Sequence, residues 1–117
     1  MLKRERDKLD KLWSKKIMEN SRCAICGMPA DDPHHFKTKK QGNSLRWYLP
    51  NGIPLCRQHH NAHLYSAHHS PDWFNTQIKA LRGKDYIEDI DRQAKIIFKG
   101  NYQQILNYLE GRTNNYC

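Results

Sequence analysis

The sequence has no long apolar segment, and it is poor in apolar residues overall. No apolar run approaches the roughly 20 residues that a membrane span requires, and the charged start has no apolar signal-peptide core. We therefore expect a soluble, cytoplasmic protein that does not bind membranes. Hydrophobic residues make up only 38% of the 117 residues. A chain of this composition buries a thin core, which a bound metal can help to hold.

Acidic residues are also scarce relative to basic ones. The chain has 20 Lys and Arg against 12 Asp and Glu, which gives a formal net charge of +8. The excess lies in residues 1–69, which hold 13 of the basic and 6 of the acidic residues. All seven histidines fall between positions 34 and 69. This balance fits a polyanionic partner, nucleic acid before a membrane surface.

The length favours a single domain over 1–117, and the patterning predicts the α+β class. Residues 1–20 predict a basic amphipathic helix, because Leu9, Trp13 and Ile17 recur at helical spacing with Lys and Arg between them. No internal repeat and no low-complexity tract interrupts the chain.

Residues 21–69 differ in kind from the helical segments on either side. The stretch 23–54 is rich in Gly, Pro, Asn and Asp, which is typical of a knuckle and a β-hairpin with a long loop. The segment 57–66 contains no helix breaker and predicts a short helix. Residues 70–112 predict a helical C-terminal extension, with Ser70 as the cap of its first helix and helices over 71–82, 86–99 and 102–110.

Two short motifs predict a structural zinc site. In a reducing compartment, cysteines are better metal ligands than disulfide partners. The spacings Cys23-x-x-Cys26 and Cys56-x-x-His59 each let a tight turn present two donors to one ion, and two such turns complete a tetrahedral Zn²⁺ site. Four protein ligands close the site, so we expect this zinc to stabilise the fold and do no chemistry. Cys117 is expected to be a spectator.

A second polar set surrounds the same knuckle and is not needed by a structural zinc site. It consists of His34, His35, Asn51, His60 and His63. A single histidine of this kind is commonly a solvated surface residue. Five such groups around one knuckle favour a functional site instead.

These motifs together resemble the HNH nucleases, also called the ββα-metal or His-Me finger group. The resemblance is to the zinc-containing endonuclease VII type and to small phage nucleases associated with recombination. It implies a zinc-stapled ββα-metal core flanked by an N-terminal helix and C-terminal helices. The residues that carry it are Cys23-x-x-Cys26, Asp32-Pro33-His34-His35 and Asn51-x₄-Cys56-x₂-His59-His60.

The resemblance also implies a role for each member of the second polar set. His35 matches the general base and Asn51 the asparagine that orients it, while His34 and His60 match the ligands of one catalytic metal. His63 lies one position short of a further ligand in some members, and either binds metal or contacts phosphate. A neutral imidazole can take a proton from water if its tautomer is fixed. We expect Asn51 to fix it by accepting a hydrogen bond from His35.

The implied activity is a metal-dependent DNA endonuclease that hydrolyses phosphodiester bonds in phage DNA recombination or processing, in the cytoplasm of a bacterial host. An imidazole-rich site suits Mn²⁺, Ni²⁺, Co²⁺ or Zn²⁺ as well as Mg²⁺. The partner would be DNA, branched or nicked DNA included, bound by a monomer or a homodimer. The basic loop after the general base supplies the predicted DNA contacts, Lys37, Lys39, Lys40 and Arg46.

In a rival interpretation, the chain is a zinc-containing DNA-binding module without catalytic activity. The histidines outside the zinc site then have no functional role. A protein-interaction adaptor built on the zinc knuckle is disfavoured, because the basic charge is concentrated on the half of the chain that contains the knuckle.

Overall fold

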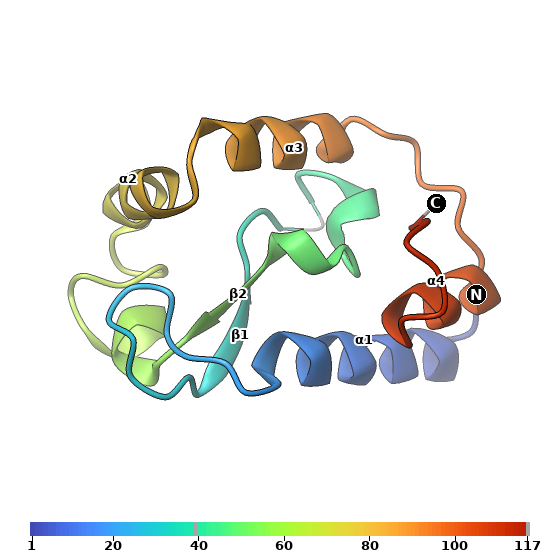
Figure 1. Ribbon diagram of the computed structural model, residues 1–117, viewed down its shortest axis with the longest axis horizontal. Helices are drawn as coiled ribbons and strands as arrows, with labels where there is room; N and C mark the ends of the chain where they lie inside the picture. The colour runs from blue at the N-terminus through green and yellow to red at the C-terminus, as the bar shows by residue number, and fades with distance from the viewer. Residues whose placement is uncertain (39, 117) are drawn as a thin grey trace.

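The computed structural model describes residues 1–38 and 40–116, so that the predicted DNA contact Lys39 and the predicted spectator Cys117 lie outside the described residues. Helices surround a small two-stranded sheet (Figure 1), which confirms the α+β class. In chain order the elements are α1 (Lys3–Met18), β1 (Asp32–His35), the short turns η1 (Asn43–Leu45) and η2 (Leu49–Asn51), β2 (Gly52–Leu55), the π-helical turn η3 (Gln58–Ala62), α2 (Pro71–Arg82), α3 (Lys84–Ala94) and α4 (Tyr102–Leu109).

Helix α1 confirms the amphipathic pattern predicted for the N-terminal segment. Its buried residues Leu9, Trp13 and Ile17 follow one another at intervals of four, which places them on one face. That face rests on the hairpin where β2 begins. A Cβ atom at Gly52 would overlap the Ile17 side chain and lie 2.8 Å from the Trp13 ring. Glycine at position 52 therefore sets how closely α1 approaches the sheet.

The hairpin positions two neighbouring histidines on different sides of the sheet. Strands β1 and β2 are antiparallel, with His34 opposite Ile53 and His35 opposite Gly52. Successive side chains of a strand point to opposite faces. The His35 ring accordingly stacks on Trp13 of α1, with 4.0 Å between ring centroids. The His34 ring lies edge to face with Phe74 of α2, with a centroid separation of 5.3 Å.

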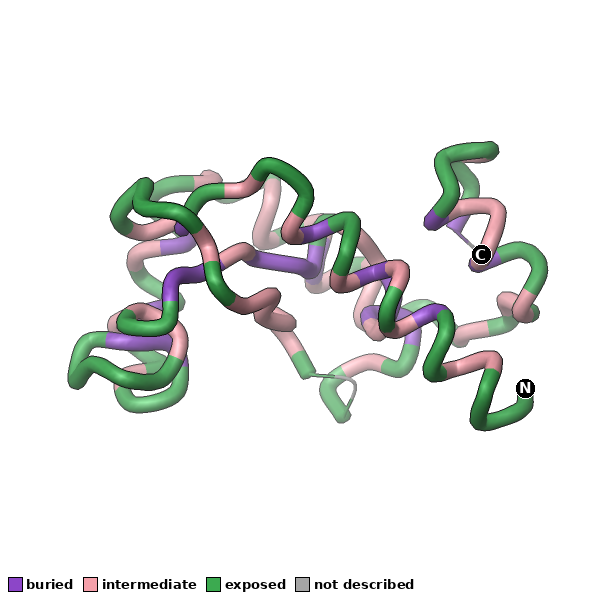
Figure 2. Tube along the Cα trace, turned by 90° about the horizontal axis from the view of Figure 1, so that it is seen from below, coloured by how far each residue is buried: buried purple, intermediate pink, exposed green. Residues whose placement is uncertain are grey.

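Two clusters of buried side chains hold these elements together, and Figure 2 shows the buried positions along α1 and the hairpin. One cluster joins α1, the chain after η1 and α4, and consists of Leu9, Trp13, Ile17, Trp47, Ile105, Leu109 and Tyr116. The other joins the knuckle, β2 and α2, and consists of Cys23, Ile53, Leu55, Cys56, Ala67, Phe74 and Ile78.

Some predicted helices have different bounds in the structure. The helix predicted over 57–66 is shortened to Gln58–Ala62, because the chain then turns back and Ala67 N–H donates to the His59 carbonyl at 2.8 Å. The helix predicted over 86–99 is Lys84–Ala94 instead. Its predicted last turn leaves the helix, and Phe98 packs on Trp47 at 5.9 Å between ring centroids.

The cap predicted for α2 is also wrong in detail. The Ser70 hydroxyl donates to the Leu64 carbonyl at 2.7 Å and makes no cap hydrogen bond to α2. By contrast, α4 begins with a capping box between Asn101 and Gln104. Within residues 1–38 and 40–116, no helix has the length and apolar character needed to cross a membrane.

Candidate metal centres

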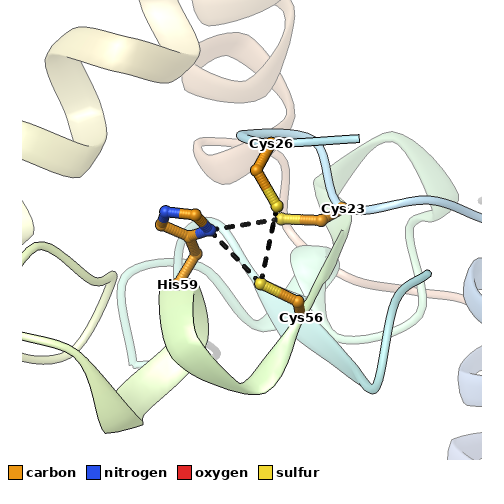
Figure 3. Close-up of side chains that lie close together, drawn as sticks. All are labelled: Cys23, Cys26, Cys56 and His59. Atoms are coloured by element: carbon orange, nitrogen blue, oxygen red, sulfur yellow. Dashed lines mark hydrogen bonds between the residues drawn. The ribbon is translucent and has the colours of Figure 1, made fainter. Parts of the chain in front are cut away.

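Four metal-binding side chains converge beside the hairpin, as the motif spacing predicted. Cys23 and Cys26 lie on the knuckle after α1, Cys56 follows β2, and His59 lies on η3. Figure 3 shows the four side chains pointing toward one another. Their donor atoms all lie within 4.8 Å of one another, so this group can hold a metal ion. We call it the Cys₃His cluster.

The spacing of these donors fits a tetrahedral ion. The sulfur atoms of Cys26 and Cys56 are 3.7 Å apart, and His59 Nδ1 lies 3.2 Å from Cys56 Sγ and 3.8 Å from Cys23 Sγ. Ligand bonds of about 2.3 Å to sulfur and about 2.0 Å to nitrogen give tetrahedral edges of about 3.8 Å between sulfurs and about 3.5 Å between sulfur and nitrogen. A disulfide would need about 2.05 Å. The cluster therefore matches a four-ligand structural metal site.

Backbone hydrogen bonds shape the knuckle that carries two of these donors. Gly27 N–H donates to the Cys23 carbonyl at 2.9 Å, and Cys23 N–H donates to the Met28 carbonyl at 2.7 Å. Gly27 has a φ of +77°, which favours glycine. Burial, followed by contact with the neighbouring thiols, raises the pKa of Cys56 to about 11. A bound cation would oppose this effect by stabilising the thiolate.

A second group of three imidazoles lies next to the first. The donor atoms of His34, His60 and His68 all lie within 4.8 Å of one another, so they too can hold a metal ion. We call this group the His₃ cluster. His60 Nε2 is 3.1 Å from His68 Nε2. The other nitrogen of His60 is 3.3 Å from Asp32 Oδ2, an outer carboxylate of the kind that orients metal-binding imidazoles.

His68 is the member of the cluster that the second polar set predicted from the sequence does not include. It reaches the cluster because the chain after η3 folds back, with His68 N–H donating to the His60 carbonyl at 3.1 Å. The eight-residue separation matches no regular periodicity. The enrichment of histidine in this segment was therefore the only sequence signal from the residues themselves.

Burial favours the neutral form of two of the His₃ imidazoles, those of His34 and His68. It lowers the pKa of His34 to about 3, with smaller contributions from His60, His68 and His35. Burial also lowers the pKa of His68. Neutral imidazoles are the form that binds metal. His34 borders a cavity of about 220 Å³, which is also lined by Phe36, Lys37, Gln41, Ala67, Pro71, Phe74 and Asn75.

His35, the predicted general base, faces a different cavity. Its Nε2 lies 2.9 Å from the Arg46 carbonyl. A carbonyl only accepts hydrogen bonds, so in the neutral ring Nε2 carries the hydrogen and Nδ1 the lone pair. The cavity measures about 380 Å³ and is lined by Asp10, Trp13, Ser14, His35, Thr38 and Arg46.

Asn51 takes a role that differs from the predicted one. Its side chain is fully buried. The carboxamide oxygen accepts from Lys37 N–H at 2.9 Å, and the amide nitrogen donates to the Lys37 carbonyl at 2.9 Å and the Leu45 carbonyl at 3.4 Å. The Asn51 carboxamide thus makes its hydrogen bonds to backbone groups. The hydrogen bond predicted between Asn51 and His35 is replaced by one from His35 Nε2–H to the Arg46 carbonyl. Asn51 therefore fixes the loop between the strands and acts on His35 only through that loop.

His63 lies outside both clusters, so its predicted metal contact is not formed. The side chain is exposed, and its Nδ1 accepts from Tyr65 N–H at 3.3 Å. It follows η3 at the point where the chain leaves the helical path, with φ −100° and ψ 157°. This change of direction carries its imidazole away from His60.

The predicted DNA contacts near His35 are partly occupied by acidic partners. The Lys37 ammonium pairs with the Asp91 carboxylate. The Arg46 guanidinium binds both carboxylate oxygens of Asp10, at 3.1 and 2.8 Å, and this contact raises the pKa of Arg46. Lys40 is exposed and has no ion pair with any described residue.

Asp10 also organises the backbone beside His35. Its Oδ1 accepts from the Trp47 indole N–H at 2.8 Å as well as from Arg46. Helix α1 thereby contacts both Arg46 and Trp47, and the peptide that joins these two residues contains the Arg46 carbonyl. Asp10 of α1 thus helps to fix the position of the carbonyl that accepts a hydrogen bond from His35.

Comparison with known proteins provides a partial relative. No protein-family model matches the chain, and no solved structure matches it. Over 40 residues, or 33% of this chain, it is 52% identical to the uncharacterized protein YdfU of Escherichia coli strain K12. The match covers 12% of that protein, so the chain spans only a small part of the length of the relative.

Proposed function

We propose that the chain is a metal-dependent DNA endonuclease of the HNH type, with a structural zinc in the Cys₃His cluster and a catalytic divalent ion in the His₃ cluster. One observation carries the proposal. A closed four-donor cluster and a three-imidazole cluster lie side by side, joined at the adjacent residues His59 and His60. In this proposal β1, β2 and η3 form a zinc-stapled ββα-metal core, and the biological context is phage DNA recombination or processing.

The donor chemistry of the Cys₃His cluster supports zinc. Three thiolates and one imidazole form a soft set, and a tetrahedral set of this composition is typical of structural Zn²⁺. The ion would cross-link the knuckle to η3. In a chain with few apolar residues, this bond contributes stability that the hydrophobic core does not supply.

The His₃ donors support an ion with open coordination positions. When bound there, a divalent ion supplies Lewis-acid stabilisation for charge that develops on the phosphodiester. Three imidazoles suit Mn²⁺, Ni²⁺, Co²⁺ or Zn²⁺ at least as well as Mg²⁺, which prefers oxygen ligands. His34, His60 and His68 would hold the ion, and Asp32 would keep His60 in the tautomer that presents Nε2.

His35 is the proposed general base. The Arg46 carbonyl holds its Nε2–H, and Trp13 packs against one face of the ring. Nδ1 can then accept a proton from the water that attacks phosphorus, while the ring keeps its orientation. The charge of His35 is among those that lower the pKa of His34, which places the two residues within electrostatic reach of each other.

One observation favours the alternative, a zinc-containing DNA-binding module without catalysis. His34 and His35 point to opposite faces of β1, and each borders its own cavity. A nuclease must bring one phosphodiester to both residues at the end of this strand. A binding module has no such requirement.

Cleavage assays with matched histidine variants separate the two functions. We would incubate supercoiled and branched DNA with Mn²⁺ or Mg²⁺ and compare the wild type with His35→Ala, His60→Ala and the control His69→Ala. His69 is exposed and lies outside both clusters. We expect the wild type and the control to cleave, and the first two variants to be at least about 100-fold slower.

Cleavage that survives in both His35→Ala and His60→Ala would overturn the proposed site. If no divalent ion supports cleavage by the wild type while salt-sensitive DNA binding persists, the binding module is the better account. Equal loss in the His69→Ala control would mean that the imidazoles act through the fold and not through the chemistry.

A further inference from the structure

The outer face of α1 carries a row of basic side chains. Its members are Arg4, Lys8, Lys11 and Lys15, which we call the basic stripe. At 3.6 residues per turn they fall within an arc of about 60° and extend over about 16 Å of the helix. The arc lies opposite the buried face of α1, and all four side chains are exposed.

The acidic residues of α1 have their closest polar contacts outside the stripe, although Asp7 also lies within electrostatic range of Lys11. Glu5 accepts from the Leu2 backbone N–H at 2.8 Å, and Asp7 pairs with Lys3 at 2.9 Å. Asp10 faces inward to Arg46 and Trp47. Of the ion pairs within residues 1–38 and 40–116, none involves a member of the stripe. Direct ion pairs with described residues therefore do not account for these four cations.

Several cations nearer the hairpin, by contrast, already have partners. Lys37 pairs with Asp91, Arg46 with Asp10 at 2.8 Å, and Arg57 with Asp32 at 3.8 Å. Among the described residues of the first half, the stripe thus supplies four cations without an ion pair, and Lys40 and Arg22 are two further ones outside α1.

The stripe is fixed relative to the His35 cavity. Helix α1 contacts both strands, and Trp13 packs on the His35 ring. Asp10 and Ser14 of the same helix line the His35 cavity, on the flank of α1 that adjoins the stripe. A polyanion that follows the stripe therefore passes close to the proposed base.

Duplex DNA fits this surface better than a membrane does. One strand of a duplex places a phosphate every 3.4 Å of rise, so about 16 Å of helix faces about four or five phosphates. The stripe contains no aromatic residue to read or stack on bases, which favours contact with the backbone alone. Membrane-surface helices expose large apolar side chains beside their basic face. In α1 the residues Leu9, Trp13 and Ile17 are buried instead.

We propose that the basic stripe of α1 binds the phosphate backbone of duplex DNA, without sequence preference, and holds it beside the His35 cavity. The choice of DNA as the partner rests on the proposed endonuclease function. The stripe itself rests on the separate observation of four exposed cations on one face of a helix that form no ion pair with a described residue.

The test compares two variants with the same loss of charge. In the stripe variant Arg4, Lys8, Lys11 and Lys15 are changed to Gln, which keeps helix propensity high. In the control four exposed lysines of the second half, Lys79, Lys84, Lys95 and Lys99, are changed to Gln. Circular dichroism and metal content establish that both are folded. Binding to two labelled 20-base-pair duplexes of unrelated sequence is measured by fluorescence anisotropy over a range of KCl, with no added divalent ion.

We expect the slope of log affinity against log salt to become less steep by about 3 to 4 in the stripe variant, equally for both duplexes, and to stay near the wild-type value in the control. Equal slopes for the two variants would overturn the proposal. So would wild-type binding to vesicles that contain phosphatidylserine, if the stripe variant loses it while retaining DNA binding.

The outcome also separates the stripe from the catalytic proposal. If DNA binding depends on the stripe but no divalent ion supports cleavage by the wild type, the stripe is supported and the nuclease is removed. A stripe variant that binds and cleaves as well as the wild type would remove the stripe and leave the nuclease standing.

Discussion

The two candidate metal clusters differ in how the chain supplies their donors. The Cys₃His cluster takes two donors from each of two tight turns, at the same x₂ spacing. The His₃ cluster takes one donor each from β1, η3 and the segment that follows η3. Two short turns can hold an ion with four protein donors and leave no coordination position open. Three donors from separate segments would leave coordination positions of an ion open beside a cavity. Such a site suits a ligand that binds and dissociates.

The largest expected effect is on the closed cluster. Cys56→Ser removes a thiolate from the Cys₃His cluster, and we expect the chain to lose its fold at 25 °C. Structural zinc contributes about 10–16 kcal/mol at pH 7 in small domains, as much as the whole stability of many proteins. Circular dichroism and metal content per chain provide the measurement, with His63→Ala as the control. A folded Cys56→Ser protein would show that the two clusters do not differ in this way.

The open cluster should respond in the opposite way. His68→Ala removes one of the three imidazoles at an exposed position. We expect the fold to persist, with one metal fewer per chain and cleavage slower by at least about 100-fold, as for His60→Ala. Metal analysis, thermal unfolding and the plasmid assay measure these effects, beside His69→Ala. Unchanged metal content would remove His68 from the cluster.

A smaller effect is expected where α1 supports His35. Asp10→Asn keeps an acceptor for Trp47 but loses the charge that holds Arg46. We expect the fraction of His35 protonated at Nε2 to fall, cleavage to slow by about 10-fold, and stability to drop by about 1 kcal/mol. Nitrogen-15 NMR of the imidazole reports the tautomer directly, and Asp10→Glu should restore it. If the tautomer is unchanged, the contribution of Asp10 is structural only.

The smallest effect is expected at the edge of the His₃ cavity. The ion pair between Lys37 and Asp91 is partly exposed, so Lys37→Met should lower stability by less than about 1 kcal/mol. Since Asp91 already neutralises the ammonium, we expect the salt dependence of DNA binding to change little. Urea unfolding and anisotropy titrations measure both quantities. A decrease in slope of about 1 would restore Lys37 as a phosphate contact.

Local rules explain what could be predicted from the sequence. The spacing of Cys23, Cys26, Cys56 and His59 defines two turns, and turns fix their geometry within a few residues. The apolar periodicity of α1 likewise needs only neighbouring positions. Both features depend on short-range geometry, which the order of residues expresses directly.

The remaining features depend on contacts between distant positions. Arg46 meets Asp10 across 36 residues, and Lys37 meets Asp91 across 54, so neither cation could be identified as occupied. The Arg46 carbonyl replaced Asn51 beside His35 because the loop between the strands folds inward, which no side-chain motif encodes. His68 joined the His₃ cluster through a reversal of the chain after η3. Such reversals leave no periodic signal.

The π-helical turn η3 determines how the protein would take up its ions. His59 and His60 are joined by one peptide bond, yet they serve different clusters. An ion in the Cys₃His cluster orders the backbone of His59 and, with it, the position of His60. A second ion then meets donors that are already arranged, so the free energy of binding to the second cluster depends on occupancy of the first, and the dependence is reciprocal. Metal titration of such a protein would show ordered and cooperative loading.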